Sequence, residues 1–228
     1  MREAVIKIGG FAFPRPHEAG LGLLEGLASV VKRLVREGFR LAVVVGGGPL
    51  ARDMIALARS VGASEPLCDE LGMMASRCNA YLFSLVLDPA SRPDIPSDFP
   101  SLAEALASRQ LVVVGGLHPG QSTDTVAVLA AELLGAGMVV KATDVDGIYT
   151  SDPKKDPGAV RLPRLTYDDA LELLSRMPAR AGAYELLDLQ AIRLARRSGI
   201  RIRVVDGREP ENVYKAVRGE ELGSLVGP

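Results

Sequence analysis

The 228-residue sequence contains no tryptophan, and aromatic residues make up only 4% of it. Few aromatic side chains leave few platforms on which nucleic acid bases can stack. The formal net charge is −1, whereas domains that bind nucleic acid usually carry an excess of lysine and arginine. We therefore expect no nucleic acid partner.

Cysteine and histidine are equally scarce, with two residues of each. Cys68 and Cys78 form no C-x-x-C pair and have no histidine nearby at the spacing of zinc ligands. Free thiols are the expected state of both, which suits a reducing cytoplasm. We predict a cytoplasmic location and no metal site built from protein side chains.

Long apolar runs are missing too. The most apolar stretch, residues 111–134, is interrupted by His118, Asp124 and Glu132, so it does not reach the roughly 20 apolar residues of a membrane span. The first residues include acidic charge and only a short apolar run, and we expect neither a membrane span nor a secretion signal. With 47% hydrophobic and 24% charged residues, the chain can bury a large core.

Short apolar runs alternate with longer segments of helical period. The expected strands are 5–8, 41–45, 111–114, 138–142 and 201–205, and the expected helices are 23–37, 50–61, 69–85, 124–134, 167–174, 186–197 and one that begins at Pro210. This alternation predicts an α/β fold with a largely parallel sheet covered on both faces. Residues 88–100 and 151–163 are expected to be loops, and one domain spanning 1–228 is expected.

Paired or triple glycine follows three of the predicted strands: Gly9-Gly10, Gly46-Gly47-Gly48 and Gly115-Gly116. Ligands of open parallel sheets bind at the carboxyl ends of the strands. A residue without Cβ lets backbone N–H groups approach phosphate oxygens. One such turn is equally typical of a plain strand-to-helix connection, but three at one edge favour a site for several phosphates. The triplet also leads into a predicted helix, whose N-terminus attracts anions.

The commonest nucleotide-binding motifs are absent. The chain has no G-x-x-x-x-G-K-[ST], no G-x-G-x-x-G that opens a helix after a strand, and neither the H-R-D nor the D-F-G of protein kinases. These absences argue against a P-loop enzyme and a classical dehydrogenase, and they exclude a relative of the protein kinases. Another phosphate-binding fold is required.

Three charged residues near the glycine turns have both a structural and a functional interpretation. Lys7 is either a strand lysine that reaches solvent or a cation that neutralises a transferring phosphoryl group. Asp124 either caps the helix at 124–134 or holds Lys7 in place. Arg52 is either an exposed helix residue or a bidentate clamp on an acceptor phosphate.

The segment 141–153 is the most specific stretch of the sequence. Its Asp-Gly turn is compatible with a simple hairpin. Beside the glycine turns, it is better interpreted as a platform for a nucleotide base and ribose, with Asp146 or Asp152 close to a metal or a hydroxyl.

Four motifs together carry a family resemblance: Lys7 with Gly9-Gly10, the Val-Gly-Gly-Gly turn, Gly-Gly-x-His-Pro-Gly-x-[ST]-Thr-Asp-x-Val-Ala, and Thr-Asp-Val-Asp-Gly-Ile-Tyr-x-x-Asp-Pro-Lys. They resemble the amino acid kinase superfamily and, within it, the archaeal type of UMP kinase. The resemblance implies a three-layer αβα sandwich with a mainly parallel sheet of about eight strands. It implies an acceptor-binding half at about 1–135 and an ATP-binding half at about 136–228.

The resemblance also implies an activity. The γ-phosphoryl group of ATP would pass to UMP, giving UDP and ADP for pyrimidine nucleotide and CTP synthesis, with Mg²⁺ carried by the phosphates. Similar enzymes form homohexamers, so we expect a homo-oligomer.

The resemblance assigns site residues by position. The catalytic residues would be Lys7, Asp124 and Arg52. Contacts to ATP would come from Gly9, Gly10, Gly47, Arg52, Thr143, Asp144, Tyr149 and Asp152, with Asp188 in a helix beside them. Contacts to UMP would come from Gly46, Asp69, Leu117, His118, Pro119, Gly120, Gln121, Ser122 and Thr123. A second lysine of the superfamily has no clear counterpart near 184–190, which leaves the second positive charge to Mg²⁺ or an arginine.

Three alternatives stay open. Isopentenyl phosphate kinases share the fold but resemble one another in a histidine after the glycine turn, where this chain has Pro49-Leu-Ala-Arg52. Kinases of N-acetylglutamate or carbamate have less use for Arg52, because their acceptors carry no phosphate. A nucleotide-binding storage or sensor protein without turnover would not need Lys7 and Asp124 at the transfer point.

Overall fold

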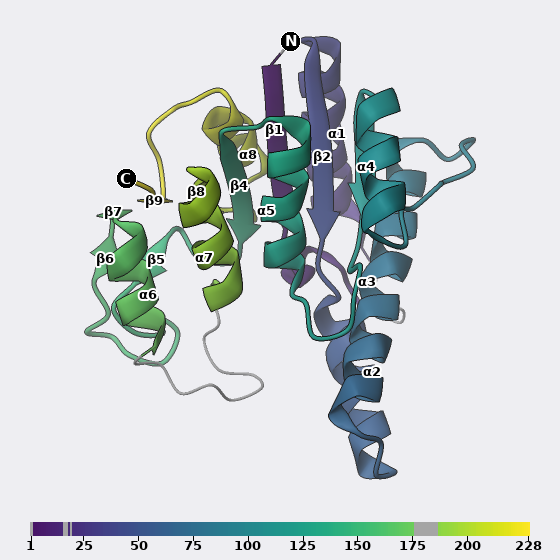
Figure 1. Ribbon diagram of the computed structural model, residues 1–228, viewed down its shortest axis with the longest axis horizontal. Helices are drawn as coiled ribbons and strands as arrows, with labels where there is room; N and C mark the ends of the chain where they lie inside the picture. Colours follow the sequence, from purple (N-terminus) through teal and green to yellow (C-terminus); the bar gives the residue numbers. More distant parts are fainter. Residues whose placement is uncertain (1, 16–17, 19, 176–186) are drawn as a thin grey trace.

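A seven-stranded sheet forms the centre of the molecule in a computed structural model that describes residues 2–15, 18, 20–175 and 187–228 (Figure 1). Its strands, in spatial order, are β3 (Leu111–Val114), β2 (Phe39–Val45), β1 (Arg2–Ile8), β4 (Met138–Thr143), β8 (Arg201–Asp206), β9 (Ser224–Val226) and β7 (Arg164–Leu165). Only β9 against β8 is an antiparallel pair among the neighbours in this sheet. A separate antiparallel pair joins β5 (Ile148–Tyr149) and β6 (Arg161–Leu162). The predicted α/β fold and mainly parallel sheet are confirmed, with seven strands in the main sheet and two outside it.

Helices cover both faces of the sheet and complete three layers. One layer holds α4 (Phe99–Ser108), α5 (Thr123–Leu134), α6 (Tyr167–Ser175) and α7 (Leu189–Ser198). The other holds α1 (Gly22–Arg36), the second half of α3 (Glu65–Leu87) and α8 (Pro210–Val217). In Figure 1, α2 (Gly48–Ser60) and the first turns of α3 extend beyond the lower edge of the sheet, where the arrowheads of the parallel strands point.

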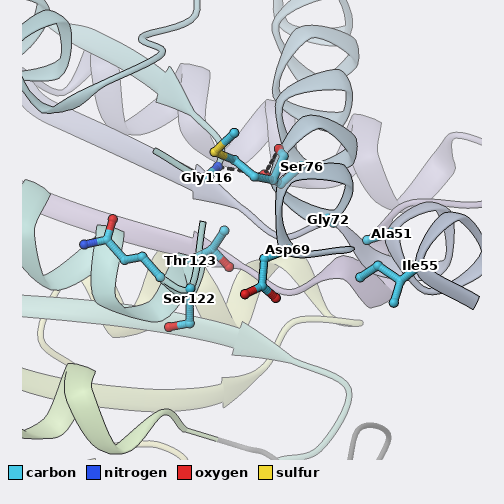
Figure 2. A pocket seen from close by; sticks show the side chains of 12 residues that line it. Ala51, Ile55, Asp69, Gly72, Ser76, Gly116, Ser122 and Thr123 are labelled. Atoms are coloured by element: carbon cyan, nitrogen blue, oxygen red, sulfur yellow. Dashed lines mark hydrogen bonds between the residues drawn. The ribbon is translucent and has the colours of Figure 1, made fainter. Parts of the chain in front are cut away.

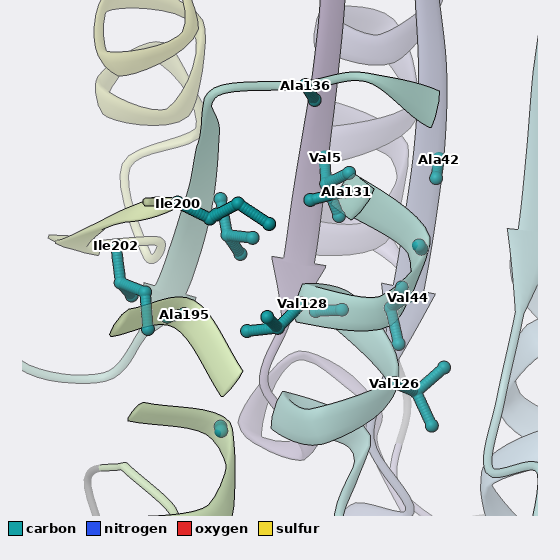
Figure 3. Close-up of a cluster of buried hydrophobic side chains, with 14 of the residues drawn as sticks. Val5, Ala42, Val44, Val126, Val128, Ala131, Ala136, Ala195, Ile200 and Ile202 are labelled. Atoms are coloured by element: carbon teal, nitrogen blue, oxygen red, sulfur yellow. The ribbon is translucent and has the colours of Figure 1, made fainter. Parts of the chain in front are cut away.

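Alternation along each strand divides the core into two clusters. In β1, Val5 packs on the side of α5, whereas Ile6 and Ile8 pack on the side of α1. Figure 3 shows the first cluster, in which Val5 of β1 lies beside Ala131 of α5 and which also contains Val44 of β2. Both faces of the central strands are buried, which explains their nearly continuous apolar sequences.

The sequence located most of these elements and missed the short ones. The predicted strand at 111–114 has the observed bounds, and the predicted helix at 167–174 ends one residue early. Helix α4 was missed because its start, with two prolines nearby, was assigned to a loop at 88–100. The expected loop at 151–163 contains β6. The predicted first residue of the helix at 186–197 lies outside the described residues, and α7 is observed from Leu189.

In the described part of the chain, no helix combines the length and apolar character that a membrane span requires.

Candidate active site

The three glycine turns lie at the carboxyl edge of the sheet, and the turns at Gly9-Gly10 and Gly46–Gly48 contact each other directly. The N–H of Gly46 donates to the carbonyl of Ile8 at 3.0 Å, and the N–H of Gly9 donates to the carbonyl of Ala142 at 2.9 Å. A Cβ added to Gly10 would lie 2.1 Å from the Cα of Gly48. No other residue type fits at Gly10, because its neighbour there is backbone. The predicted convergence of the turns at one edge is confirmed.

Helix α3 holds two of these turns through side chains. The amide of Asn79 donates to the carbonyl oxygens of Gly46 at 2.8 Å and Gly47 at 3.0 Å. The hydroxyl of Ser76 accepts from the N–H of Gly116 at 2.7 Å. The guanidinium of Arg77 donates to the carbonyl of the same glycine at 2.8 Å. The orientation of both turns is therefore fixed by one helix.

An open pocket of about 340 Å³ lies between these turns and the start of α5. Figure 2 shows it with Asp69 and Ser76 of α3 on one side and Ser122 and Thr123 on the other. Its lining consists of Gly47, Ala51, Ile55, Asp69, Gly72, Met73, Ser76, Gly116, Gly120, Gln121, Ser122 and Thr123. The pocket has a carboxylate, several hydroxyls and a thioether, which suits a ligand with a ribose and a flat base.

The pocket gathers most of the residues predicted for the acceptor. Asp69, Gly120, Gln121, Ser122 and Thr123 all line it. The remaining four predicted residues, which are Gly46, Leu117, His118 and Pro119, are not among its lining residues.

The excluded residues have other surroundings. The side chain of Leu117 packs in the core and is 7% exposed. His118 is exposed, and its Nδ1 lies 3.0 Å from the carbonyl oxygen of Pro119. Gly46 belongs to the adjoining glycine turn that Asn79 holds. The sequence did not indicate Ser76 or Met73, because a serine and a methionine in a helix are unremarkable without knowledge of what the helix faces.

Two lysines share one carboxylate beside this pocket. Nζ of Lys7 in β1 lies 3.0 Å from Oδ1 of Asp124, and Nζ of Lys141 in β4 pairs with Oδ2 of the same aspartate. The side chains of Lys7, Asp124 and Lys141 are 10%, 11% and 6% exposed. The predicted contact between Asp124 and Lys7 is confirmed. The participation of Lys141 was not predicted.

Burial and the opposite charges shift the ionisation of this cluster. Burial acts to raise the pKa of Asp124, but the charges of Lys141 and Lys7 outweigh it and lower the pKa to about 2. Burial lowers the pKa of Lys141 to about 8, against the attraction of Asp124 and with help from the like charge of Lys7. Near neutral pH the carboxylate is therefore ionised and Lys141 is largely protonated.

The first turn of α5 is positioned by Asp188, the N-cap of α7. Oδ2 of Asp188 accepts hydrogen bonds from the hydroxyls of Ser122 and Thr125, each at 2.6 Å. Oδ1 accepts from the N–H of Gln190 at 3.0 Å, which caps α7. The same aspartate thus joins α5, the helix that carries Asp124, to the start of α7.

The predicted ATP segment lies at the end of β4. Thr143 is buried there, and Asp144 pairs with Lys154. The hydroxyl of Tyr149 donates to Oδ1 of Asp146 at 2.5 Å, and this hydrogen bond, with a smaller contribution from burial, raises the pKa of the tyrosine. Oδ1 of Asp152 accepts from the N–H of Lys154 at 3.0 Å. The end of β4 adjoins the Gly9-Gly10 turn, because the N–H of Gly9 donates to the carbonyl of Ala142, the residue before Thr143.

Arg52 is exposed on the first turns of α2, next to Ala51, and does not line the pocket. Within the described residues, no hydrogen bond or ion pair involves its side chain. Among the described residues there is also no group of three or more histidine, cysteine or acidic side chains that could hold a metal ion.

Comparison with known proteins identifies the family. Residues 2–206 match the model of the amino acid kinase family. The chain belongs to the amino acid kinase family. Its archaeal members include a uridylate kinase from Hyperthermus butylicus, 46% identical over 97% of this chain and 96% of that protein, and one from Methanothrix thermoacetophila, 41% identical over 97% and 98%.

Solved structures of the family agree with the fold. The crystal structure of uridylate kinase from Archaeoglobus fulgidus has a TM-score of 0.85 to this chain at 36% identity, with 100% of both chains covered. The UMP kinase from Bacillus anthracis has a TM-score of 0.80 at 23% identity, over 99% of this chain and 96% of that one. The second likeness bears on the fold alone.

Proposed function

We propose that this protein is a UMP kinase, which transfers the γ-phosphoryl group of ATP to UMP and releases UDP and ADP. The observation that carries the proposal is the juxtaposition of two consecutive residues. Thr123 lines the pocket, and Asp124 holds the two buried lysines. A phosphate in this pocket therefore lies next to a cluster of positive charge, as phosphoryl transfer between phosphates requires. The names of the archaeal relatives support the choice of UMP.

We assign the pocket to UMP and the end of β4 to ATP, which divides the chain into an acceptor half at about 1–135 and an ATP half at about 136–228. In the acceptor half, the carboxylate of Asp69 binds the ribose hydroxyls or the base, and Gly120 to Thr123 enclose the nucleotide. Gly46, Leu117, His118 and Pro119 belong to the two loops that shape this pocket. In the ATP half, contacts come from Thr143, Asp144, Tyr149 and Asp152, with Gly9, Gly10 and Gly47 at the phosphates.

The proposed reaction is an in-line attack by a phosphate oxygen of UMP. This phosphate is largely dianionic near neutral pH, so no general base is required. Lys7 stabilises the negative charge on the oxygens of the transferring phosphoryl group, and Asp124 keeps Lys7 in position. Arg52 grips the phosphate of UMP from α2, which its long exposed side chain reaches by a change of rotamer.

Mg²⁺ fits this site as a companion of the ATP phosphates. The described residues offer no acidic cluster that would hold the ion alone, so oxygens of the β- and γ-phosphates would be its main ligands. When bound, it supplies neutralisation of phosphate charge. By likeness to the family we also propose a homo-oligomer, with a hexamer as the expected form, and a cytoplasmic location.

The test is ADP release from Mg-ATP in the presence of single acceptors. UMP and dUMP are compared with CMP, isopentenyl phosphate, N-acetylglutamate and carbamate. Turnover with UMP at least about 100-fold above every acceptor other than dUMP supports the proposal. Preference for another acceptor would show that the pocket binds that acceptor and not UMP. Binding of ATP without turnover of any acceptor would favour a nucleotide sensor.

A further inference from the structure

The lysine and aspartate cluster contains one more positive charge than negative charge. Lys7 and Lys141 each contact one oxygen of Asp124, and all three side chains are at most 11% exposed. A buried charge without a counter-charge is costly, so an unbalanced cluster indicates that a negative group completes it. The phosphoryl group that moves between two nucleotides is such a group.

Asp188 is the next carboxylate that faces Lys141, and it does not balance the cluster by contact. It attracts the lysine electrostatically, but the described contacts include no ion pair between them. Its oxygens instead accept hydrogen bonds from Ser122, Thr125 and Gln190. Asp188 therefore attracts Lys141 only weakly and without contact, whereas Asp124 is in contact with both lysines.

The register of the sheet puts the two lysines at the same depth. Lys7 in β1 is the direct partner of Lys141 in β4, and the strands are parallel. Their side chains share the face that Val5 and Val139 bury against α5. Like charges directly opposite each other on neighbouring strands are destabilising. The placement of Lys7 opposite Lys141 is explained if two anions, Asp124 and a phosphoryl group, both lie between their ammonium groups.

We propose that Lys141 is the second cation of the phosphoryl-transfer site. This inference rests on the proposed function and adds to it a residue from β4, where sequence reasoning left the second positive charge to a metal ion or an arginine. Lys7 and Lys141 both face the transferring group, and Asp124 spaces their ammonium groups.

The two lysines stabilise negative charge on the transferring group and do not donate or accept a proton. The bond between the γ-phosphorus and the bridging oxygen of ATP breaks, and its electron pair leaves with ADP. A bond forms between the same phosphorus and an oxygen of the UMP phosphate. Lys141 stays protonated throughout and stabilises the oxygens of the group in transit, which in comparable sites contributes about 10²-fold to the rate.

A purely structural role makes a different prediction. If Lys141 serves only to neutralise Asp124, its loss changes stability and leaves the chemical step intact. Lys7 remains 3.0 Å from the carboxylate in that case, so Asp124 keeps a partner and the variants are expected to fold.

The first arm of the test is steady-state kinetics of Lys141→Met and Lys141→Arg. We expect the methionine variant to lose about 100-fold in kcat, with the KM values for ATP and UMP within about 3-fold of wild type. The arginine variant, which keeps the charge, is expected to recover at least 10-fold of this loss. Lys215→Met, which removes an exposed lysine from α8, is the matched control and is expected to leave kcat unchanged. A kcat within 3-fold of wild type in Lys141→Met, or an effect on KM alone, overturns the proposal.

The second arm needs no acceptor and separates this inference from the choice of UMP. Calorimetry measures the affinity for Mg-ADP with and without fluoroaluminate, which imitates a phosphoryl group in transit. Wild type is expected to bind Mg-ADP at least 10-fold more tightly when fluoroaluminate is added, and Lys141→Met is expected to lose this gain while binding Mg-ADP alone normally. If wild type fails to use UMP and the gain still depends on Lys141, the proposed function is wrong and the role of Lys141 stands. An equal gain in both proteins overturns the role of Lys141.

Discussion

The side-chain amide of Asn79 donates a 2.8 Å hydrogen bond to the carbonyl oxygen of Gly46, and the same amide reaches Gly47 at 3.0 Å. Asn79 is 5% exposed, so these carbonyl groups are satisfied inside the protein and not by solvent. The bond ties the middle of α3 to the turn between β2 and α2. The N–H groups of that turn are therefore held in one orientation before a phosphate arrives.

Removal of this amide is expected to weaken both the fold and the site. Asn79→Ala leaves two carbonyl oxygens without their donor, and an unsatisfied buried polar group costs about 1 to 3 kcal/mol. We predict a loss of this size in the free energy of unfolding, measured by urea denaturation, and a rise in the KM for nucleotide. Cys78→Ala changes the exposed neighbour on the same helix and is expected to change neither. An Asn79→Ala protein with wild-type stability would contradict this account.

The contact between Gly10 and Gly48 leaves no room for a methyl group. The added Cβ of Gly10→Ala would lie 2.1 Å from the Cα of Gly48, so the turns must separate. We predict a loss of more than about 2 kcal/mol in the free energy of unfolding together with most of the activity. Gly137→Ala is the control, because a Cβ there meets nothing within 4 Å. If Gly10→Ala is as stable and active as Gly137→Ala, the turns are not packed as described.

Lys7 and Arg52 are predicted to affect different kinetic parameters. Lys7→Ala removes the positive charge that is proposed to stabilise the transferring group. This should lower kcat by about 10²-fold, with a small change in either KM. Arg52→Ala removes the proposed contact to the acceptor phosphate, which would be made both before and during transfer, so it should raise the KM for UMP by about 10-fold. Steady-state kinetics with each substrate varied in turn measures both. Equal effects of both substitutions on kcat and KM would contradict this division of roles.

Asp124 is predicted to make the free energy of unfolding depend on pH in the acidic range. Its pKa is about 2 in the folded protein, below the ordinary value of 3.8 that the unfolded chain retains. The unfolded state therefore binds the proton first, and the stabilisation is complete above about pH 4 and is lost as the pH falls toward 2. One pKa unit corresponds to about 1.4 kcal/mol, so the loss is about 2 kcal/mol.

Urea denaturation at a series of pH values between 5 and 2 measures this loss. Asp124→Asn should remove this part of the slope. Asp168→Asn, at an exposed carboxylate on α6, should leave it. A wild-type slope that survives in Asp124→Asn would show that other groups cause it.

The rate of transfer is predicted to fall in mild base. Burial lowers the pKa of Lys141 to about 8, and the like charge of Lys7 acts in the same direction, against the attraction of Asp124 and Asp188. Above that pH the lysine loses its proton, and with it the charge that faces the phosphoryl group. We expect kcat to decline as the pH rises through about 8. Lys141→Arg should abolish the decline up to about pH 10, because arginine stays protonated; a decline at the same pH in that variant would assign it to another group.

The sequence predicted the layers and the glycine turns because their signals are local. Apolar periodicity and Gly-Gly after a strand are visible in a few consecutive residues, and the turns at Gly9 and Gly46 follow directly. Short elements such as β5 and β9 have no such signal, because they depend on pairing with distant strands. Helix α4 was missed because the prolines near its start favour a loop, although Asp98 and Ser101 form a capping box that indicates a helix start.

The proximity of Lys141 to Lys7 and Asp124, on which its proposed role rests, was not predicted for a different reason. The segment that begins with it was interpreted as a nucleotide platform, and the register that sets it opposite Lys7 is a property of two strands more than 130 residues apart in sequence. Asn79 and Ser76 were missed likewise, since only tertiary packing brings their helix onto the glycine turns. For Lys141, the available signal in the sequence was a lysine within the apolar strand 138–142.

The most direct test of the central claim follows the phosphorus atom itself. Protein is incubated with ATP labelled at the γ-phosphate, Mg²⁺ and UMP, and the products are separated and quantified. The account predicts label in the β-phosphate of UDP, equal in amount to the ADP formed and reduced about 100-fold in Lys7→Ala. ADP formation with the label in inorganic phosphate, or no transfer to UMP by a folded protein that binds ATP, would contradict it.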